Sequence, residues 1–151
     1  PHLSAKLANE VLDPEVITKA TRRLRNKYDV VLLEGAGGLL VPITEQLLTL
    51  DYIAEQGYPV ILVTSGRLGS INHTLLSLEA IKSRDLEIHS VIYNHIHDNA
   101  AQTDEQIAAS TIEFLHSYLA EHYPTAHWLA LPVQEDDGCS NVDFILPQKF
   151  I

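Results

Sequence analysis

The sequence has almost no cysteine and no methionine. Cys139 is the only cysteine among 151 residues. A single thiol can form neither an internal disulfide nor a zinc site built from several cysteines. Such cysteine usage is typical of a reducing compartment, so we expect a cytoplasmic protein.

Basic residues are also scarce. Ten lysines and arginines stand against 20 aspartates and glutamates, which gives a formal net charge of -10. Because the basic residues form no long run, the sequence argues against a protein that binds nucleic acid non-specifically. An anion such as ATP is still compatible with this charge, since backbone N–H groups, one or two local cations and a divalent metal can together bind phosphate.

Long hydrophobic runs are missing as well. No apolar stretch approaches the roughly 20 residues that span a bilayer, and the polar start of the chain is not a signal peptide. Hydrophobic residues nevertheless make up 46% of the chain, with a mean hydropathy of +0.02, so a core can form. Since no repeat or linker interrupts the chain, we expect one soluble domain over residues 1–151.

Short apolar blocks are the candidates for strands. They are Asp29–Leu33, Pro59–Thr64, Glu87–Tyr93 and His127–Leu131. The first two contain unbroken apolar runs rather than alternating ones, which favours strands covered on both faces and therefore a parallel sheet.

Segments with helical spacing lie before and between these blocks: Pro14–Lys27, Thr49–Gln56, Ser70–Ser83 and Thr103–His122. Asp13 and Pro14 are a helix start signal, and Gly57 is a stop signal. The alternation of helix and strand predicts right-handed βαβ units in a three-layer α/β fold with a mostly parallel sheet. In such sheets ligands bind beyond the carboxyl ends of the strands.

The strongest local motif follows the first apolar block. Glu34 directly follows the block, and the chain then turns at once into Gly35–Ala36–Gly37–Gly38. A carboxylate at a strand tip, followed by backbone with almost no side chains, can hold a hydrated Mg²⁺ while phosphate approaches the chain closely. The alternative interpretation is a tight turn that needs glycine, with a solvated glutamate beside it.

Polar groups follow the other strand candidates. After the second block, Ser65–Gly69 lead into a helix whose first N–H groups suit a carboxylate or phosphate, although Ser70 could simply cap an ordinary loop. Asn94 follows the third block and could bind a purine edge or serve as a turn residue. Pro132 follows the fourth block and could wall a base pocket. His95, His97 and Asp98 are of metal-ligand types, and the i, i+2 spacing puts both imidazoles on one side of an extended segment, but no convincing third ligand lies nearby in the sequence, so polar loop residues are favoured there.

Together these blocks resemble one family in order and spacing. The motif EGAGG after an apolar strand, then PVILV-x-x-G-x-LGSINH, then strands ending in Asn and in Leu-Pro, is similar to dethiobiotin synthetase along the whole chain. The resemblance implies a P-loop NTPase-like fold and an ATP- and Mg²⁺-dependent ligase. That ligase closes the ureido ring of dethiobiotin from 7,8-diaminononanoate and CO2, and it works as a homodimer.

The resemblance also implies roles for individual residues. Glu34 would bind Mg²⁺, and the substrate tail would lie across a two-fold interface. The ATP site would comprise Glu34, Gly35, Ala36, Gly37, Asn94, His95, Pro132, Val133 and Gln134. The substrate site would comprise Pro1, His2, Leu68, Gly69, Ser70 and Asn72. His95 stands where the family often has Asp, and the acidic residue after the Leu-Pro turn could be Glu135, Asp136 or Asp137.

One family motif is absent from these 151 residues. A G-x-x-x-x-G-K-[ST] phosphate loop does not occur, so we expect a chain that lacks the first strand and this loop and is inactive by itself. Two other interpretations stay open. The chain could be a non-catalytic paralogue that acts as a dimerising binding module, or it could belong to another P-loop ligase such as a cobyrinic acid synthase.

Overall fold

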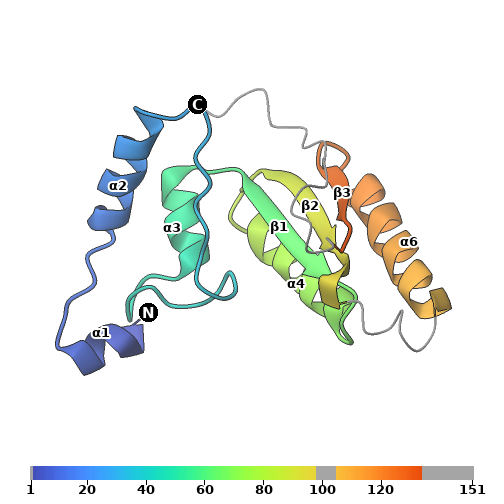
Figure 1. The fold of residues 1–151 in the computed structure, drawn as a ribbon, viewed down its shortest axis with the longest axis horizontal. Coiled ribbons are helices and arrows are strands. Elements are labelled where there is room, and N and C mark those ends of the chain that lie inside the picture. Colours follow the sequence, from blue (N-terminus) through green and yellow to red (C-terminus); the bar gives the residue numbers. More distant parts are fainter. Residues whose placement is uncertain (1, 98–104, 134–151) are drawn as a thin grey trace. The chain divides into compact units, whose positions relative to one another are not determined.

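The structure is a computed structural model that describes residues 2–97 and 105–133. Residues 2–57 form one compact unit, and the described residues from 58 onward form a second. The first unit contains α1 (His2–Ala8), α2 (Glu15–Arg25) and α3 (Thr49–Gln56). The second contains β1 (Val60–Ser65), α4 (Ser70–Lys82), β2 (Ile88–Asn94), η1 (His95–His97), α6 (Glu105–His122) and β3 (His127–Leu131). Figure 1 shows these elements along the chain. The expectation of a single domain stays a prediction.

Local sequence signals explain the two main helices of the first unit. The Asp13 carboxylate accepts a hydrogen bond from the N–H of Glu15, at 3.0 Å, where α2 begins. The α3 helix ends at Gln56 and is capped by Gly57, whose φ of 64° is left-handed and whose N–H donates to the Ala54 carbonyl. Both expected boundaries are confirmed, because a side-chain acceptor and a glycine supply what a helix start and stop require.

The core of the first unit joins α2 to α3. The hydroxyl groups of Thr18 and Tyr52 lie 3.0 Å apart, and both side chains are buried. Leu50, on the first turn of α3, is fully buried. A buried pair of hydroxyls fixes the facing positions of the two helices, because either group would be costly to bury without a partner.

The strand predicted at Asp29–Leu33 is wrong. The structure has no strand there, and the side chains of Leu32 and Leu33 are 71% and 45% exposed. An extended apolar run becomes a strand only when a neighbour pairs with its N–H and C=O groups. Within residues 2–97 and 105–133, no strand pairs with this segment. The apolar run therefore has no neighbouring strand with which to form a sheet in the described part of the chain.

The second unit is an α/β sheet, as expected. Its strands are parallel in the order β1-β2-β3, and the other predicted strands and helices match within one or two residues where the structure describes them. The central strand β2 is buried from Ile88 to Tyr93. The edge strand β1 is less covered than expected, since Val63 is 59% exposed. The α/β fold class is confirmed.

Contacts place α4 and α6 on one face of this sheet. The hydroxyl of Thr64 in β1 meets Thr74 of α4, and the Trp128 ring in β3 meets His116 of α6. Thr64 is paired with Tyr93 and Trp128 with Val91, and residues two apart on β2 point to the same face. The described part of this unit therefore has a helical layer and a sheet layer. The third layer stays a prediction.

The helical layer contributes aliphatic side chains to the core. Leu78 and Ile81 of α4 and Leu115 and Leu119 of α6 are at most 2% exposed. Each such side chain contributes about 1.5–3 kcal/mol when removed from water. The buried face of α4 begins with two hydroxyl residues, Ser70 and Thr74, rather than with hydrocarbon. None of the helices described is long and apolar enough to cross a membrane.

One histidine is buried in the sheet. His89 in β2 is 7% exposed, its Nδ1 lies 3.2 Å from the Ser90 hydroxyl, and its ring centroid lies 5.3 Å from that of His127. Burial is the main cause that lowers the pKa of His89 below 6.5; the His127 charge acts in the same direction, and Glu87 opposes them. The folded chain therefore favours the neutral imidazole.

We expect acid to destabilise the fold through His89. In the unfolded chain His89 takes up a proton near pH 6.5, whereas in the folded chain it resists protonation. The free energy of unfolding should therefore be highest above pH 6.5 and fall as the pH drops from there toward the lowered folded pKa. Urea unfolding followed by the fluorescence of Trp128, the single tryptophan, should show this slope. His89→Gln should flatten it, and the exposed His73→Gln should not; an unchanged slope in His89→Gln would contradict the assignment.

Candidate functional site

The carboxyl ends of the strands in the second unit lie in one row. Ser65 of β1 pairs with Asn94 of β2, and Asn94 pairs with Leu131 of β3. Because the strands are parallel, the segment that follows each of them leaves from the same edge of the sheet. This is the edge at which ligands bind in open α/β sheets. The structure therefore brings together polar residues that are far apart in the sequence.

The loop from β1 to α4 is closed by hydrogen bonds. The Ser70 N–H donates to the Arg67 carbonyl at 2.9 Å, and the His73 N–H donates to the Gly69 carbonyl at 3.0 Å. Gly69 has a φ of 86°, which favours glycine over any residue with a side chain. The first four N–H groups of a helix lack acceptors within it. Those of Ile71 and Asn72 are therefore the donors of α4 that are left for a ligand within the described part of the chain.

Ser70 is turned into the protein. Its side chain is 9% exposed, and its hydroxyl donates to the Ser65 carbonyl. The same oxygen lies 3.2 Å from the Thr64 hydroxyl. The Ser70 side chain thus holds the loop together, and a direct contact with substrate stays a prediction. Asn72 and Leu68 are exposed, and Leu68 is among the most exposed large apolar side chains described.

A hollow of about 470 Å³ lies beside this loop. Its lining includes Thr64, Ser65, Arg67, Leu68, His73 and Asn94. The predicted substrate residues Leu68 and Ser70 and the predicted nucleotide residue Asn94 thus border one space. Arg67 and His73 were not among the residues predicted from the sequence, although a cation and an imidazole beside free N–H groups suit an anionic ligand.

Asn94 is both a turn residue and an available amide. Its Oδ1 accepts a hydrogen bond from the Ile96 N–H at 3.0 Å. That bond fixes the orientation of the side chain, and it leaves the amide NH₂ and one lone pair of Oδ1 for a ligand. The rings of His95 and Tyr93 meet in a T-shaped arrangement, with their centroids 4.9 Å apart. Of the two, Asn94 is the one that lines the hollow.

Other predicted positions are only partly described. Pro132 and Val133 follow β3 and are exposed. Gln134 and the acidic candidates Glu135, Asp136 and Asp137 lie outside the described residues, as do Pro1 and Asp98. His2 begins α1 in the first unit, and its side chain is not described. Their roles stay predictions.

The glycine segment after Glu34 lies in the first unit. Gly37 has a φ of 93°, and a Cβ built on it would lie 3.0 Å from Val41 Cγ2. A Cβ on Gly35 would lie 3.0 Å from Thr49 Cγ2. The following residues are pinned to the start of α3, because the Val41 carbonyl accepts from both the N–H and the hydroxyl of Thr49. The glycines thus allow a close approach that other residues would block.

A magnesium ion could use this segment. Within the described residues, no three His, Cys, Asp or Glu side chains gather to hold a metal, and Glu34 is an exposed carboxylate. Mg²⁺ usually keeps several waters and takes one or two carboxylates together with substrate phosphates. A single carboxylate beside open backbone therefore fits that donor set.

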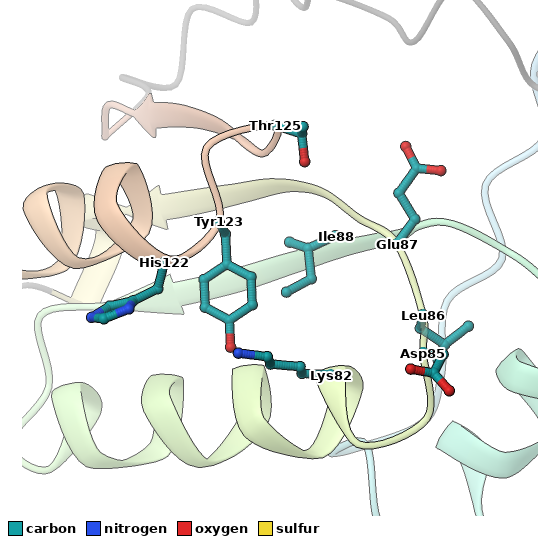
Figure 2. Close-up of a pocket in the computed structure, with 8 residues that line it drawn as sticks. All are labelled: Lys82, Asp85, Leu86, Glu87, Ile88, His122, Tyr123 and Thr125. Atoms are coloured by element: carbon teal, nitrogen blue, oxygen red, sulfur yellow. The ribbon is translucent and has the colours of Figure 1, made fainter.

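A second hollow, of about 330 Å³, lies at the opposite edge of the sheet, where α4 and α6 end. Figure 2 shows that Lys82, Asp85, Glu87 and Tyr123 line it. The Lys82 Nζ lies 5.7 Å from the centroid of the Tyr123 ring. Burial, with the charges of Tyr118 and Glu79, raises the pKa of Tyr123. Helix carboxyl ends offer carbonyls rather than N–H groups, so this edge does not suit phosphate or carboxylate.

Comparison with known proteins gives consistent matches. A family model described as "AAA domain" matches residues 1–133. An "ATP-dependent dethiobiotin synthetase BioD 2" of Pasteurella multocida is 51% identical over 124 residues, which are 82% of this chain and 56% of that protein. The protein of the same name in Haemophilus ducreyi is 48% identical over 134 residues, or 89% of this chain and 62% of that protein. An "ATP-dependent dethiobiotin synthetase BioD" of Chlorobaculum tepidum is 46% identical over 122 residues, or 81% and 49%. The chain thus spans between 49% and 62% of the length of these relatives.

Two adjacent glycines of this segment, Gly37 and Gly38, should differ in how well they tolerate replacement by alanine. Gly37→Ala should lower the free energy of unfolding by about 1–3 kcal/mol, because an alanine is strained at positive φ and its methyl would meet Val41. Gly38→Ala is the matched control, since a Cβ there meets nothing within 4 Å among the described residues. Urea unfolding followed by far-UV circular dichroism measures both. Equal stability of the two variants would show that the close approach at Gly37 does not exist.

Proposed function

The chain belongs to the dethiobiotin synthetase family, and we propose that it is part of an ATP-dependent dethiobiotin synthetase of biotin biosynthesis. The observation that carries this proposal is the row Ser65–Asn94–Leu131. At this edge of the sheet the Asn94 amide, the free N–H groups at the start of α4 and the hollow lie together. The reaction itself is inferred from the names of the relatives.

The proposed reaction joins three small molecules. One amine of 7,8-diaminononanoate would form a carbamate with CO2, and the carbamate oxygen would take the γ-phosphoryl group of ATP. The second amine would then attack the carbonyl carbon and displace phosphate, which closes the ureido ring. Such chemistry depends mainly on positioning and on neutralising phosphate charge.

Residues of the second unit would bind the adenine of ATP and the carboxylate tail of 7,8-diaminononanoate. The NH₂ group of Asn94 would donate to a ring nitrogen of adenine, and Pro132 and Val133 would form a wall of the base pocket. The N–H groups of Ile71 and Asn72, aided by Arg67, would bind the carboxylate tail of the substrate. A carboxylate suits this place because the positive end of the α4 dipole points there.

In the first unit, Glu34 would hold Mg²⁺, and Gly35, Ala36 and Gly37 would let phosphate approach the backbone. Bound there, the ion would neutralise charge on the phosphates. We also propose that the enzyme is a cytoplasmic homodimer. Leu68, which is fully exposed on the loop before α4, is an apolar group for a contact with a second subunit.

One observation favours a second candidate. The 151 residues contain no G-x-x-x-x-G-K-[ST] loop, so the chain could serve as a dimerising binding module without catalysis. In the preferred proposal, this loop belongs to a longer protein of which the chain is one part. An assay of that longer protein separates the two candidates.

We expect the 151-residue chain alone to form no dethiobiotin, because no Lys-containing loop orients the β- and γ-phosphates. The longer protein should form dethiobiotin from 7,8-diaminononanoate, bicarbonate and MgATP, with one ADP released for each product. Mass spectrometry of the product and coupled detection of ADP measure this. If the longer protein carries the loop and still gives no product, the binding module is the better account.

We expect Glu34→Gln in the longer protein to lower turnover by about tenfold or more at limiting Mg²⁺ and to raise the Mg²⁺ concentration needed for half-maximal rate. The amide keeps the shape of the side chain but loses its charge, so the fold should be unchanged. Glu55→Gln, an exposed carboxylate on α3, is the control and should behave like the native protein. A native Mg²⁺ dependence in Glu34→Gln would remove Glu34 from the metal site.

A further inference from the structure

Buried hydroxyl groups join the end of β1 to the start of α4. The hydroxyl oxygens of Thr64 and Thr74 lie 2.6 Å apart, and those of Thr64 and Ser70 lie 3.2 Å apart. The Ser70 hydroxyl in turn contacts the Ser65 carbonyl. The side chains of Thr64, Ser70 and Thr74 are 8%, 9% and 4% exposed. All of them border the hollow at the carboxyl edge of the sheet.

The hydrogen bonds of this cluster all point the same way, because each hydroxyl has one proton to donate. A carbonyl oxygen can only accept, so the Ser70 hydroxyl must donate its single proton to Ser65. Thr64 must then donate to Ser70, and Thr74 must donate to Thr64. The protons therefore run one way, from Thr74 through Thr64 and Ser70 to the Ser65 carbonyl. Hydrogen bonds that run in one direction polarise one another and strengthen the chain.

This chain of hydroxyls ties each part of the loop to a rigid element. Thr64 and Ser65 belong to β1, and Ser70 and Thr74 occupy the first two turns of α4. The Ser70 N–H also binds the Arg67 carbonyl. The position of the N–H groups of Ile71 and Asn72 relative to the sheet edge therefore depends on these hydroxyls.

We propose that Thr64 and Thr74 are positioning residues that hold the first turn of α4 at the rim of the hollow and thereby set its affinity for the carboxylate of the substrate. They act through Ser70 and the loop, because each hydroxyl donates its only proton to the next member of the hydrogen-bonded series and has none left for a ligand. Thr64 is the central link and makes two of the contacts, whereas Thr74 makes one. The effect on affinity rests on the proposed function; the effect on the loop does not.

The loop effect is measured on the 151-residue chain by amide hydrogen exchange. Thr74→Val keeps the shape of the side chain and removes the hydroxyl, and it should speed exchange at Ser70 and His73 by about fivefold to tenfold. Thr64→Val should speed it more, since two contacts are lost. Val91 in the buried strand β2 reports unfolding of the whole unit and should change less than the loop.

Two further variants separate positioning from ordinary stability. Thr74→Ser restores the hydroxyl and should restore slow exchange at Ser70 and His73. Thr18→Val removes a buried hydroxyl contact in the first unit and should leave the loop unchanged. Equal acceleration at Ser70, His73 and Val91, or none, would overturn the proposal, as would a Thr74→Ser variant that exchanges as fast as Thr74→Val.

The affinity effect is measured on the longer protein by steady-state kinetics. Thr64→Val and Thr74→Val should raise the KM for 7,8-diaminononanoate by about fivefold to tenfold, with little change in the KM for ATP or in kcat. Thr74→Ser and Thr18→Val should keep the native KM. An unchanged KM for the substrate in Thr64→Val would refute the role in affinity. If the native protein makes no dethiobiotin, the proposed function fails, and the exchange measurement still decides whether the hydroxyls position the loop.

Discussion

The parallel register of the three strands is the constraint on which the candidate site depends. Parallel strands cannot be joined by tight turns, so each connection is a long crossover, which here contains α4 or α6. The strands therefore all end at one edge, where Ser65, Asn94 and Leu131 form a row. The loop before α4, the amide of Asn94 and the turn at Pro132 leave from this row. Their proximity is a result of topology, since 66 positions of sequence separate Ser65 from Leu131.

The same topology gives the two edges of the sheet different electrostatic potentials. At the carboxyl edge α4 begins, and the N–H groups of its first turn point outward with the positive end of the helix dipole. At the opposite edge α4 and α6 end, with carbonyl groups beside Asp85 and Glu87. An anionic ligand is therefore favoured at the first edge and disfavoured at the second. A protein with a net charge of -10 can bind phosphate or carboxylate because local dipoles, rather than net charge, set the field at this edge.

Apolar periodicity predicted most of the second unit, and a glycine stop signal predicted the end of α3 in the first unit. The strands at Pro59–Thr64 and His127–Leu131 and the stop at Gly57 could be read from apolar runs and from the backbone freedom of glycine. The strand at Asp29–Leu33 could not, because a strand exists only with a partner, and the pattern of one segment does not reveal its neighbour. The burial of the Ser70 side chain could not be predicted from the sequence for a related reason. Thr64, Ser70 and Thr74 share one hydroxyl chain only because α4 packs against β1, and no local pattern shows that packing.

We propose that nucleotide and substrate meet at the carboxyl edge of the sheet. The most direct measurement is a crystal structure of the longer protein soaked with a non-hydrolysable ATP analogue and 7,8-diaminononanoate. We expect adenine within hydrogen-bond distance of the Asn94 amide and the substrate carboxylate at the N–H groups of Ile71 and Asn72. Density for either ligand at the opposite edge, beside Lys82 and Tyr123, with the carboxyl edge empty, would contradict it.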